Sequence, residues 1–201
     1  MRDPKGAART ARPMPRGGSL LLRGILAEII AMATPNPGSA RGATCGTPGP
    51  TETLLDAAGF DGFERHTLDV MRLIFADQSG TRPRHGAGPA DVADRLFGAD
   101  HGPVLLVAIT ALVQTMAIAR SEPFRYSNPY CAGCARVLTR HEALLLRVLH
   151  LVRRGRTGAA TIEALMLCDS RPVAALLEAA DDLAALAICN ERGLAGARPA
   201  G

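Results

Sequence analysis

The chain has 201 residues, of which 47% are hydrophobic, 21% charged and 3% aromatic, and it contains no tryptophan. The hydrophobic fraction excludes a wholly disordered chain, and about 200 residues are enough for one domain with its own core plus a tail. Most of the apolar residues are alanine and leucine rather than valine or aromatic residues, which favours helices over sheets.

The formal net charge of +4 is unevenly distributed along the chain. Residues 1–50 carry seven basic and two acidic residues, whereas residues 51–201 carry 16 basic and 17 acidic ones. The basic pI of about 9.1 therefore belongs to the N-terminal arm. We expect a protein partner or self-association for the domain that follows, with nucleic acid disfavoured and no membrane.

Residues 1–50 are rich in proline, glycine, alanine and arginine, a composition that predicts a disordered basic arm. Within this arm Ser19–Ala33 is apolar, follows a basic start and ends in Ala-Met-Ala, which imitates a signal peptide. Arg23 and Glu28 interrupt the apolar run, so we expect no export and a cytoplasmic protein. Two interpretations of this stretch stay open: a short amphipathic helix, or an extended gene start with Met32 as the true initiator.

From residue 51 the apolar residues recur at helical spacing. The pattern predicts helices over residues 61–77, 89–97 and 103–119. The first helix has one apolar stripe, made of Phe63, Thr67, Val70, Met71, Ile74 and Phe75. The third has 17 residues without a charge, which is marginal for a membrane span, and Gln114 with two threonines favours a core helix instead.

The C-terminal part, residues 124–190, is predicted to form an irregular loop followed by three helices. Prolines 123 and 129 prevent a helix over 124–135. Thr139 and Glu142 then form a capping box, which predicts a helix from Arg140 to about Arg154 that ends at Gly155. Helices over about 158–168 and from about 172 to 190 follow, and residues 191–201 form a flexible tail. We therefore predict a single all-α domain over 51–190 with five or six helices and no strand.

Five cysteines are present: Cys45, Cys131, Cys134, Cys168 and Cys189. An odd number without an export signal argues against a disulfide framework and for metal or redox chemistry at the one close pair, Cys131-Ala132-Gly133-Cys134. A C-x-x-C turn supplies two of the four ligands that a structural zinc ion requires.

Folding geometry suggests the other two ligands. If the helices on either side of Gly155 form an antiparallel hairpin, Cys168 returns, about 20 Å from the turn, to the level of His141 at the start of the first helix. We therefore predict a structural zinc site made of Cys131, Cys134, His141 and Cys168. Cys189 is too far along the last helix to join it, and His150 faces the other side of its helix.

Two other interpretations of the cysteines stay open: a thiol redox pair, and buried thiols with no special role. A thioredoxin-like enzyme is disfavoured because no βαβ pattern surrounds the pair, and covalent haem because Ala135 follows Cys134. No phosphate-binding glycine loop, H-E-x-x-H or G-x-S-x-G motif is present, which favours a non-catalytic protein. We predict an interaction or regulatory protein whose C-x-x-C loop and helical hairpin are pinned by zinc.

The segment from Leu138 also resembles the helix-turn-helix domain of LuxR-type regulators. The similarity comprises Leu-Thr-x-x-Glu, a leucine-rich helix, a glycine, and then Ile162, Ser170 and Val173. It implies a transcriptional regulator whose DNA-contacting helix carries Arg171. The same helix carries Glu178, Asp181 and Asp182, which phosphates would repel, so DNA binding is the less favoured function. A run of six arginines from Arg136 to Arg156 is interpreted either as a patch for an acidic partner or as a solvated face.

Overall fold

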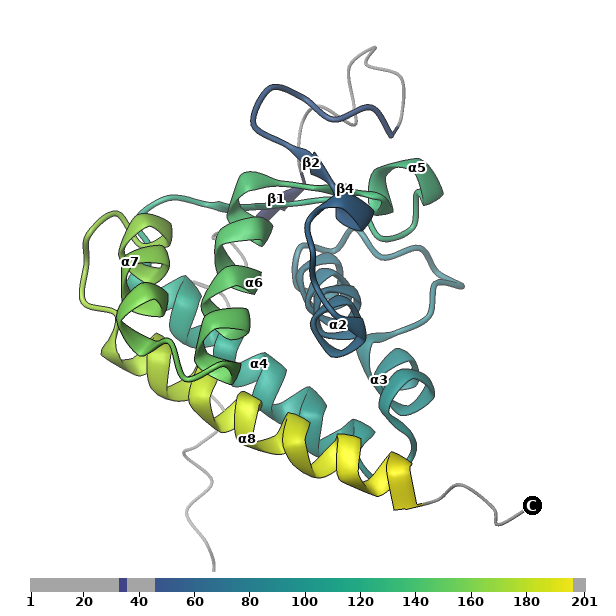
Figure 1. Ribbon diagram of the computed structural model, residues 1–201. Coiled ribbons are helices and arrows are strands. Elements are labelled where there is room, and N and C mark those ends of the chain that lie inside the picture. Colours follow the sequence, from purple (N-terminus) through teal and green to yellow (C-terminus); the bar gives the residue numbers. More distant parts are fainter. Residues whose placement is uncertain (1–32, 36–45, 197–201) are drawn as a thin grey trace, which may run out of the picture.

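The computed structural model describes residues 33–35 and 46–196, with side chains placed for 46–187 (Figure 1). Seven α-helices lie in this part of the chain, which confirms a small all-α domain, with the four-residue α5 as one helix more than predicted. The predictions for the N-terminal arm and the C-terminal tail fall largely outside the described residues. The helices are α2 (Gly62–Gln78), α3 (Pro89–Phe97), α4 (Gly102–Ala119), α5 (Ala132–Ala135), α6 (Arg140–Arg153), α7 (Thr157–Leu167) and α8 (Ala174–Gly196).

Local capping signals set the starts and ends of the main helices. The Thr139 hydroxyl accepts the N–H of Glu142, and the Glu142 carboxylate accepts the N–H of Thr139, so the predicted capping box opens α6. Asp61 and Glu64 open α2 with the same motif, which the sequence analysis did not single out. Gly155 follows α6 with a φ of +66°, in the left-handed region that favours glycine, and the chain turns there into α7.

The helices pack in the order that the hairpin prediction requires. Helices α6 and α7 lie against each other on either side of Gly155, and α8 packs along both α4 and α6 (Figure 1). Helix α3 packs on α2 and α4. The C-terminal three-helix unit is therefore α6, α7 and α8, with α4 as its base.

Four short strands lie in the described residues, where the sequence analysis predicted none. β1 (Ala33–Pro35) pairs in parallel with β3 (Phe124–Tyr126), and β2 (Thr53–Leu54) pairs antiparallel with β4 (Val137–Leu138). Strands of two or three residues are too short to show the alternation that reveals a strand. They hold two segments from the N-terminal side of α2 against the two ends of the C-x-x-C loop, and a 3-10 turn (Leu55–Ala57) leads from β2 toward α2.

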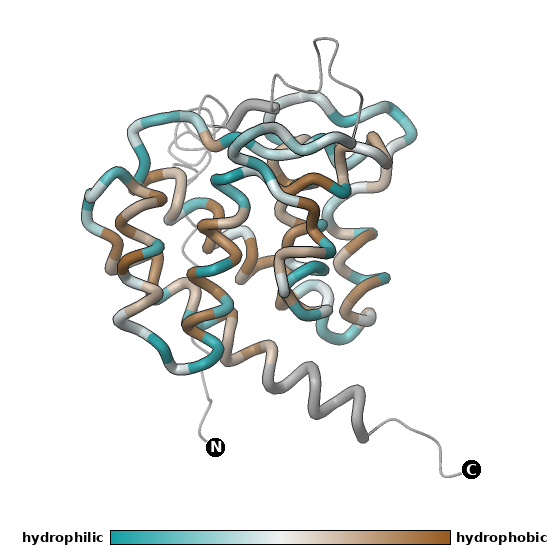
Figure 2. Tube along the Cα trace, turned by 45° about the horizontal axis from the view of Figure 1, so that its top comes forward, coloured by the Kyte–Doolittle hydropathy of each residue, from teal (hydrophilic) through white to brown (hydrophobic). Residues whose placement is uncertain are grey.

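The apolar core lies between the helices, and brown apolar segments face inward across them in Figure 2. The Phe75 ring stacks on the rings of Phe124 and Tyr126, with centroids 4.8 and 5.4 Å apart, so α2 and β3 share one aromatic cluster. Among the described helices, α4 alone is long and apolar enough to cross a membrane, a property that core helices of soluble proteins share.

Candidate functional site

The C-x-x-C loop is built on the short helix α5, between β3 and β4. Cys131 is the N-cap of α5, and its Sγ accepts the N–H of Cys134 at 3.5 Å. The Cys131 side chain is half-buried, and Cys134 is 7% exposed. A hydrogen bond donated to sulfur favours the thiolate, the form that binds metal and attacks disulfides.

A buried ion pair holds this loop on the helices. Arg72 of α2 donates to both carboxylate oxygens of Glu142, from Nε at 2.7 Å and from Nη2 at 3.0 Å. The same guanidinium donates to the carbonyls of Ala135 and Val137, at 2.6 and 2.7 Å, on the C-terminal side of the loop. Both side chains are inaccessible to solvent, and a bidentate pair of this kind is strong and directional.

Glu142 also holds the N-terminal side of the loop. Its Oε1 accepts the N–H of Ser127 at 3.0 Å, and the Ser127 hydroxyl donates to the carbonyl of Val137 at 2.8 Å. Since Oε2 accepts the N–H of Thr139 as well, one carboxylate receives two guanidinium and two backbone donors. The loop that carries Cys131 and Cys134 is therefore fixed at both ends by a single buried pair.

The N-terminal segment approaches the loop closely at one point. A Cβ added to Gly46 would lie 3.2 Å from both the Cα and the carbonyl oxygen of Gly133, the third residue of the C-x-x-C motif. Gly46 also has a φ of +94°, so a side chain at this position would be strained as well as crowded. Residue 46 is thus a contact of the loop, and Cys45, which precedes it in the sequence, lies outside the described residues.

His141 and Cys168, the other two predicted ligands, lie in different surroundings. His141 Nδ1 accepts the N–H of Arg125 at 2.9 Å, and its ring packs at 5.6 Å from that of Phe124. Burial and the nearby charges of Arg120, Arg125 and Arg140 lower the pKa of His141 to about 4. The imidazole is therefore neutral at pH 7.

Cys168 is the C-cap of α7 and is fully buried. Burial raises the pKa of its thiol, and Asp169 adds to this against the opposing effects of Arg120 and Arg171. Arg120 is itself buried and donates to the carbonyl of Leu167, next to Cys168. Cys168 thus lies in the packed junction of α4 and α7.

The structure does not gather the four predicted ligands. No group of three or more His, Cys, Asp or Glu side chains within the described ranges could hold a metal ion. The hairpin returns Cys168 as expected, but α7 lies on one side of α6 and α5 on the other (Figure 1). His141 also points away, since Glu142 faces the loop and adjacent helical residues diverge by about 100°. Zinc binding by this chain stays a prediction.

A second buried acid connects the opposite ends of α2 and α6. Glu64 of α2 is fully buried and accepts from Arg153 and Arg154 at 2.9 and 3.0 Å, with His150 Nδ1 at 3.1 Å. Burial raises the pKa of nearby Asp61, but the N–H of Glu64 and then Arg153 and Arg154 outweigh it and hold that pKa below its ordinary value. Two of the six arginines in the basic run are therefore paired with acids of α2.

Sequence reasoning missed the partners of both buried acids. One signal was available: Arg72 interrupts an otherwise apolar run between Met71 and Leu73, where a charged residue needs a buried partner. The identity of that partner was not readable, because Arg72 and Glu142 are 70 residues apart in the chain.

Comparison with protein-family models, with curated proteins and with solved structures gives no match to this chain.

Proposed function

We propose that this chain is a non-catalytic interaction or regulatory protein whose C-x-x-C loop binds a structural zinc ion. The observation that supports the proposal is the anchoring of the loop: the Arg72–Glu142 pair holds both of its ends while the Cys134 N–H is directed at Cys131 Sγ. A preformed pair of thiols loses little conformational freedom on binding, so ligation adds folding free energy to the surrounding loop.

Two thiols are half of a tetrahedral zinc site, so further ligands must come from elsewhere. His141 and Cys168 remain in the proposal as the ligands expected from the hairpin, although the pair and these two residues lie apart in the structure. Cys45 is tested alongside them, because the peptide bond ties it to Gly46, which contacts Gly133.

The test is the metal content of the full chain purified under reducing conditions, measured by mass spectrometry. The proposal expects about one zinc ion per chain, lost in Cys131→Ser and in Cys134→Ser. Parallel variants Cys45→Ser, Cys168→Ser and His141→Asn identify the other ligands, and Cys189→Ser is the matched thiol control. Zinc that persists without Cys131 and Cys134, or no bound metal at all, overturns the proposal.

A thiol redox switch is the second candidate, favoured by the proximity of Cys131 and Cys134. In that case the two thiols would form a disulfide, and a peroxide would take up the two electrons and two protons to leave water or an alcohol. Fast reaction of both thiols with an alkylating reagent in metal-free protein, and reversible loss of both thiols with peroxide, would favour this function over zinc. Slow alkylation that becomes fast only after chelation would favour zinc.

DNA binding gains no support from the arrangement of the basic residues. Arg153 and Arg154 pair with Asp61 and Glu64, which reduces the positive charge that a phosphate backbone would meet. The regulator alternative therefore depends on Arg171, and salt-dependent duplex binding lost in Arg171→Ala is the result that would revive it.

A further inference from the structure

Helix α4 has two apolar faces, and the fold covers one of them. Leu105, Ile109, Leu112 and Met116 are fully buried against the core. Val104, Val107 and Ile118, at helical spacing on another face, are exposed, with Val107 at 71%. A helix that is apolar all round is ordinarily buried all round, so the second face requires an explanation.

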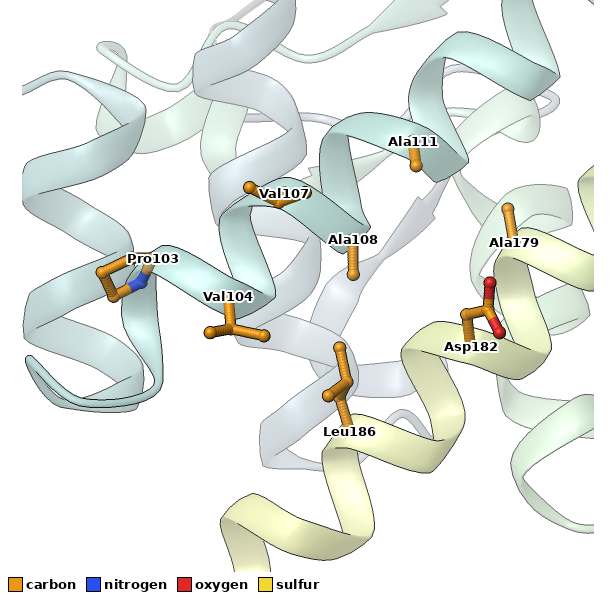
Figure 3. A pocket seen from close by; sticks show the side chains of 8 residues that line it. All are labelled: Pro103, Val104, Val107, Ala108, Ala111, Ala179, Asp182 and Leu186. Atoms are coloured by element: carbon orange, nitrogen blue, oxygen red, sulfur yellow. The ribbon is translucent and has the colours of Figure 1, made fainter. Parts of the chain in front are cut away.

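The uncovered face forms a groove with α8. A hollow of about 550 Å³ lies between Val104, Val107 and Ala111 of α4 and Ala179, Asp182 and Leu186 of α8 (Figure 3). A second hollow of about 270 Å³ continues past it, between Thr115 and Ile118 of α4 and Ala175 and Leu176 of α8. Together they follow α4 over most of its length, with Asp182 as the charged residue of the wider part.

The chain from the N-terminal arm arrives beside one end of this groove. The backbone of β1 pairs with β3, with Ala33 opposite Phe124. The Phe124 ring lies 5.9 Å from the guanidinium carbon of Arg120, the residue that caps the C-terminal end of α4. Residues preceding Ala33 therefore start from the end of α4 where Ile118 lies.

The segment before Ala33 has the length and apolar pattern that this groove needs. Residues 19–32 carry an apolar stripe at helical spacing, Leu21, Leu22, Ile25, Leu26, Ile29 and Met32. A helix of 14 residues is about 21 Å long, and the exposed stripe of α4 from Val104 to Ile118 rises by the same amount.

We propose that residues 19–32 form an amphipathic helix that lies in the α4–α8 groove, parallel to α4, with Met32 near Ile118. In this register Arg23 comes level with Asp182, and the two opposite charges meet at the groove. The occupant is a segment of the same chain, which is tethered to the groove by β1 and so binds at a high effective concentration.

Hydrogen exchange of the full chain, followed by mass spectrometry, tests this arrangement. Amides of residues 20–32 should exchange at least about tenfold more slowly than in a synthetic peptide of residues 19–32, the factor that about 1.4 kcal/mol of docking produces. Val107→Asp should abolish this protection, while protection of α2 reports that the fold persists. Ile162→Asp on α7 is the matched control, since Ile162 is likewise exposed, at 61%, and should leave residues 20–32 protected.

Charge reversal tests the register. Arg23→Asp should weaken the protection of residues 20–32, and adding Asp182→Arg should restore it. Exchange as fast as in the free peptide overturns the proposal, as does protection that Val107→Asp does not change. Protection that disappears on dilution together with a dimeric mass assigns the groove to a second copy, and flotation with vesicles that Val107→Asp abolishes assigns it to a membrane; either result also overturns the proposal.

Discussion

Two buried glutamates join α2 to α6, and they differ in what surrounds them. Glu64 and Arg72 are eight residues apart on α2, and Glu142 and His150 are eight residues apart on α6, so the two antiparallel helices are connected at two levels about 12 Å apart. At one level α2 supplies the base and α6 the acid. At the other level the roles are exchanged.

The difference lies in access to water. Arg72 and Glu142 are both fully buried, and every contact of the pair also holds the C-x-x-C loop. Glu64 is equally buried, but its partners reach the surface, and the Arg154 side chain is 43% exposed. Charges that stay in contact with water are screened, whereas a closed pair is not, so the first level should control structure and the second should respond to solution conditions.

The largest effect is expected from Glu142→Gln. The substitution leaves the Arg72 guanidinium buried without its counter-charge, which typically costs about 3–5 kcal/mol. Guanidinium denaturation measures this loss of unfolding free energy. Because the carboxylate also anchors Ser127 and Thr139, alkylation of Cys131 should become faster in the same variant. A loss below about 1 kcal/mol would show that the two levels do not differ as argued.

Glu64→Gln tests the second level with the same chemical change. Hydrogen bonds to charged groups contribute about 1.5–3 kcal/mol, and Gln keeps the size and one acceptor of Glu64, so we expect a loss of about 1.5–3 kcal/mol. Urea denaturation in low and high salt separates the two levels, because urea adds no ions. Salt should shrink the effect of Glu64→Gln and leave that of Glu142→Gln nearly unchanged. Equal salt dependence of both variants would contradict the comparison.

His141 gives the chain a pH dependence of its own. Its pKa is about 4 in the folded protein and 6.5 in the unfolded chain, so between these values the unfolded state binds more protons. Stability should therefore fall as pH decreases from about 6.5 to about 4, and the slope should flatten in His141→Asn, whose amide oxygen can still accept the N–H of Arg125. Thermal unfolding across this pH range measures the slope, and identical slopes for both proteins would contradict the assignment.

Asp56→Asn is the solvent-exposed counterpart of the two glutamate variants. Asp56 pairs with Arg65 at 2.9 Å, but its side chain is 75% exposed. Exposed pairs contribute about 0–1 kcal/mol, so we expect the smallest change of the series, within about 0.5 kcal/mol, in the same denaturation experiment. A loss as large as that of Glu64→Gln would mean that burial does not rank these three carboxylates.

Much of the secondary structure was predictable because its signals are local. Pro89 and Gly98 bound α3 as predicted, and the Thr139–Glu142 box opens α6 at Arg140. Each of these signals acts within four residues, so no tertiary contact is needed to read it. The strands were missed for the opposite reason, since two or three residues form a strand here only through a partner far away in the chain.

The candidate site was predictable only in part. The C-x-x-C motif is visible in the sequence, and the hairpin about Gly155 formed as expected. The inference from that hairpin to a four-ligand cluster did not account for rotation about α6, which directs Glu142 toward the loop and His141 toward Arg125. Whether the loop binds zinc is a question for the metal analysis of the cysteine variants.

The sequence by itself determined the helical class, the helix boundaries and the position of the paired thiols, because propensity, capping and turn chemistry act between near neighbours. Only the tertiary structure decided which charges are buried together. Arg72 and Glu142 have no local relation, and they meet because the packing of α2 against α6 leaves a dry space that a lone charge could not occupy. Burial, which is a property of the whole fold, thus turns an ordinary capping residue into the anchor of the candidate site.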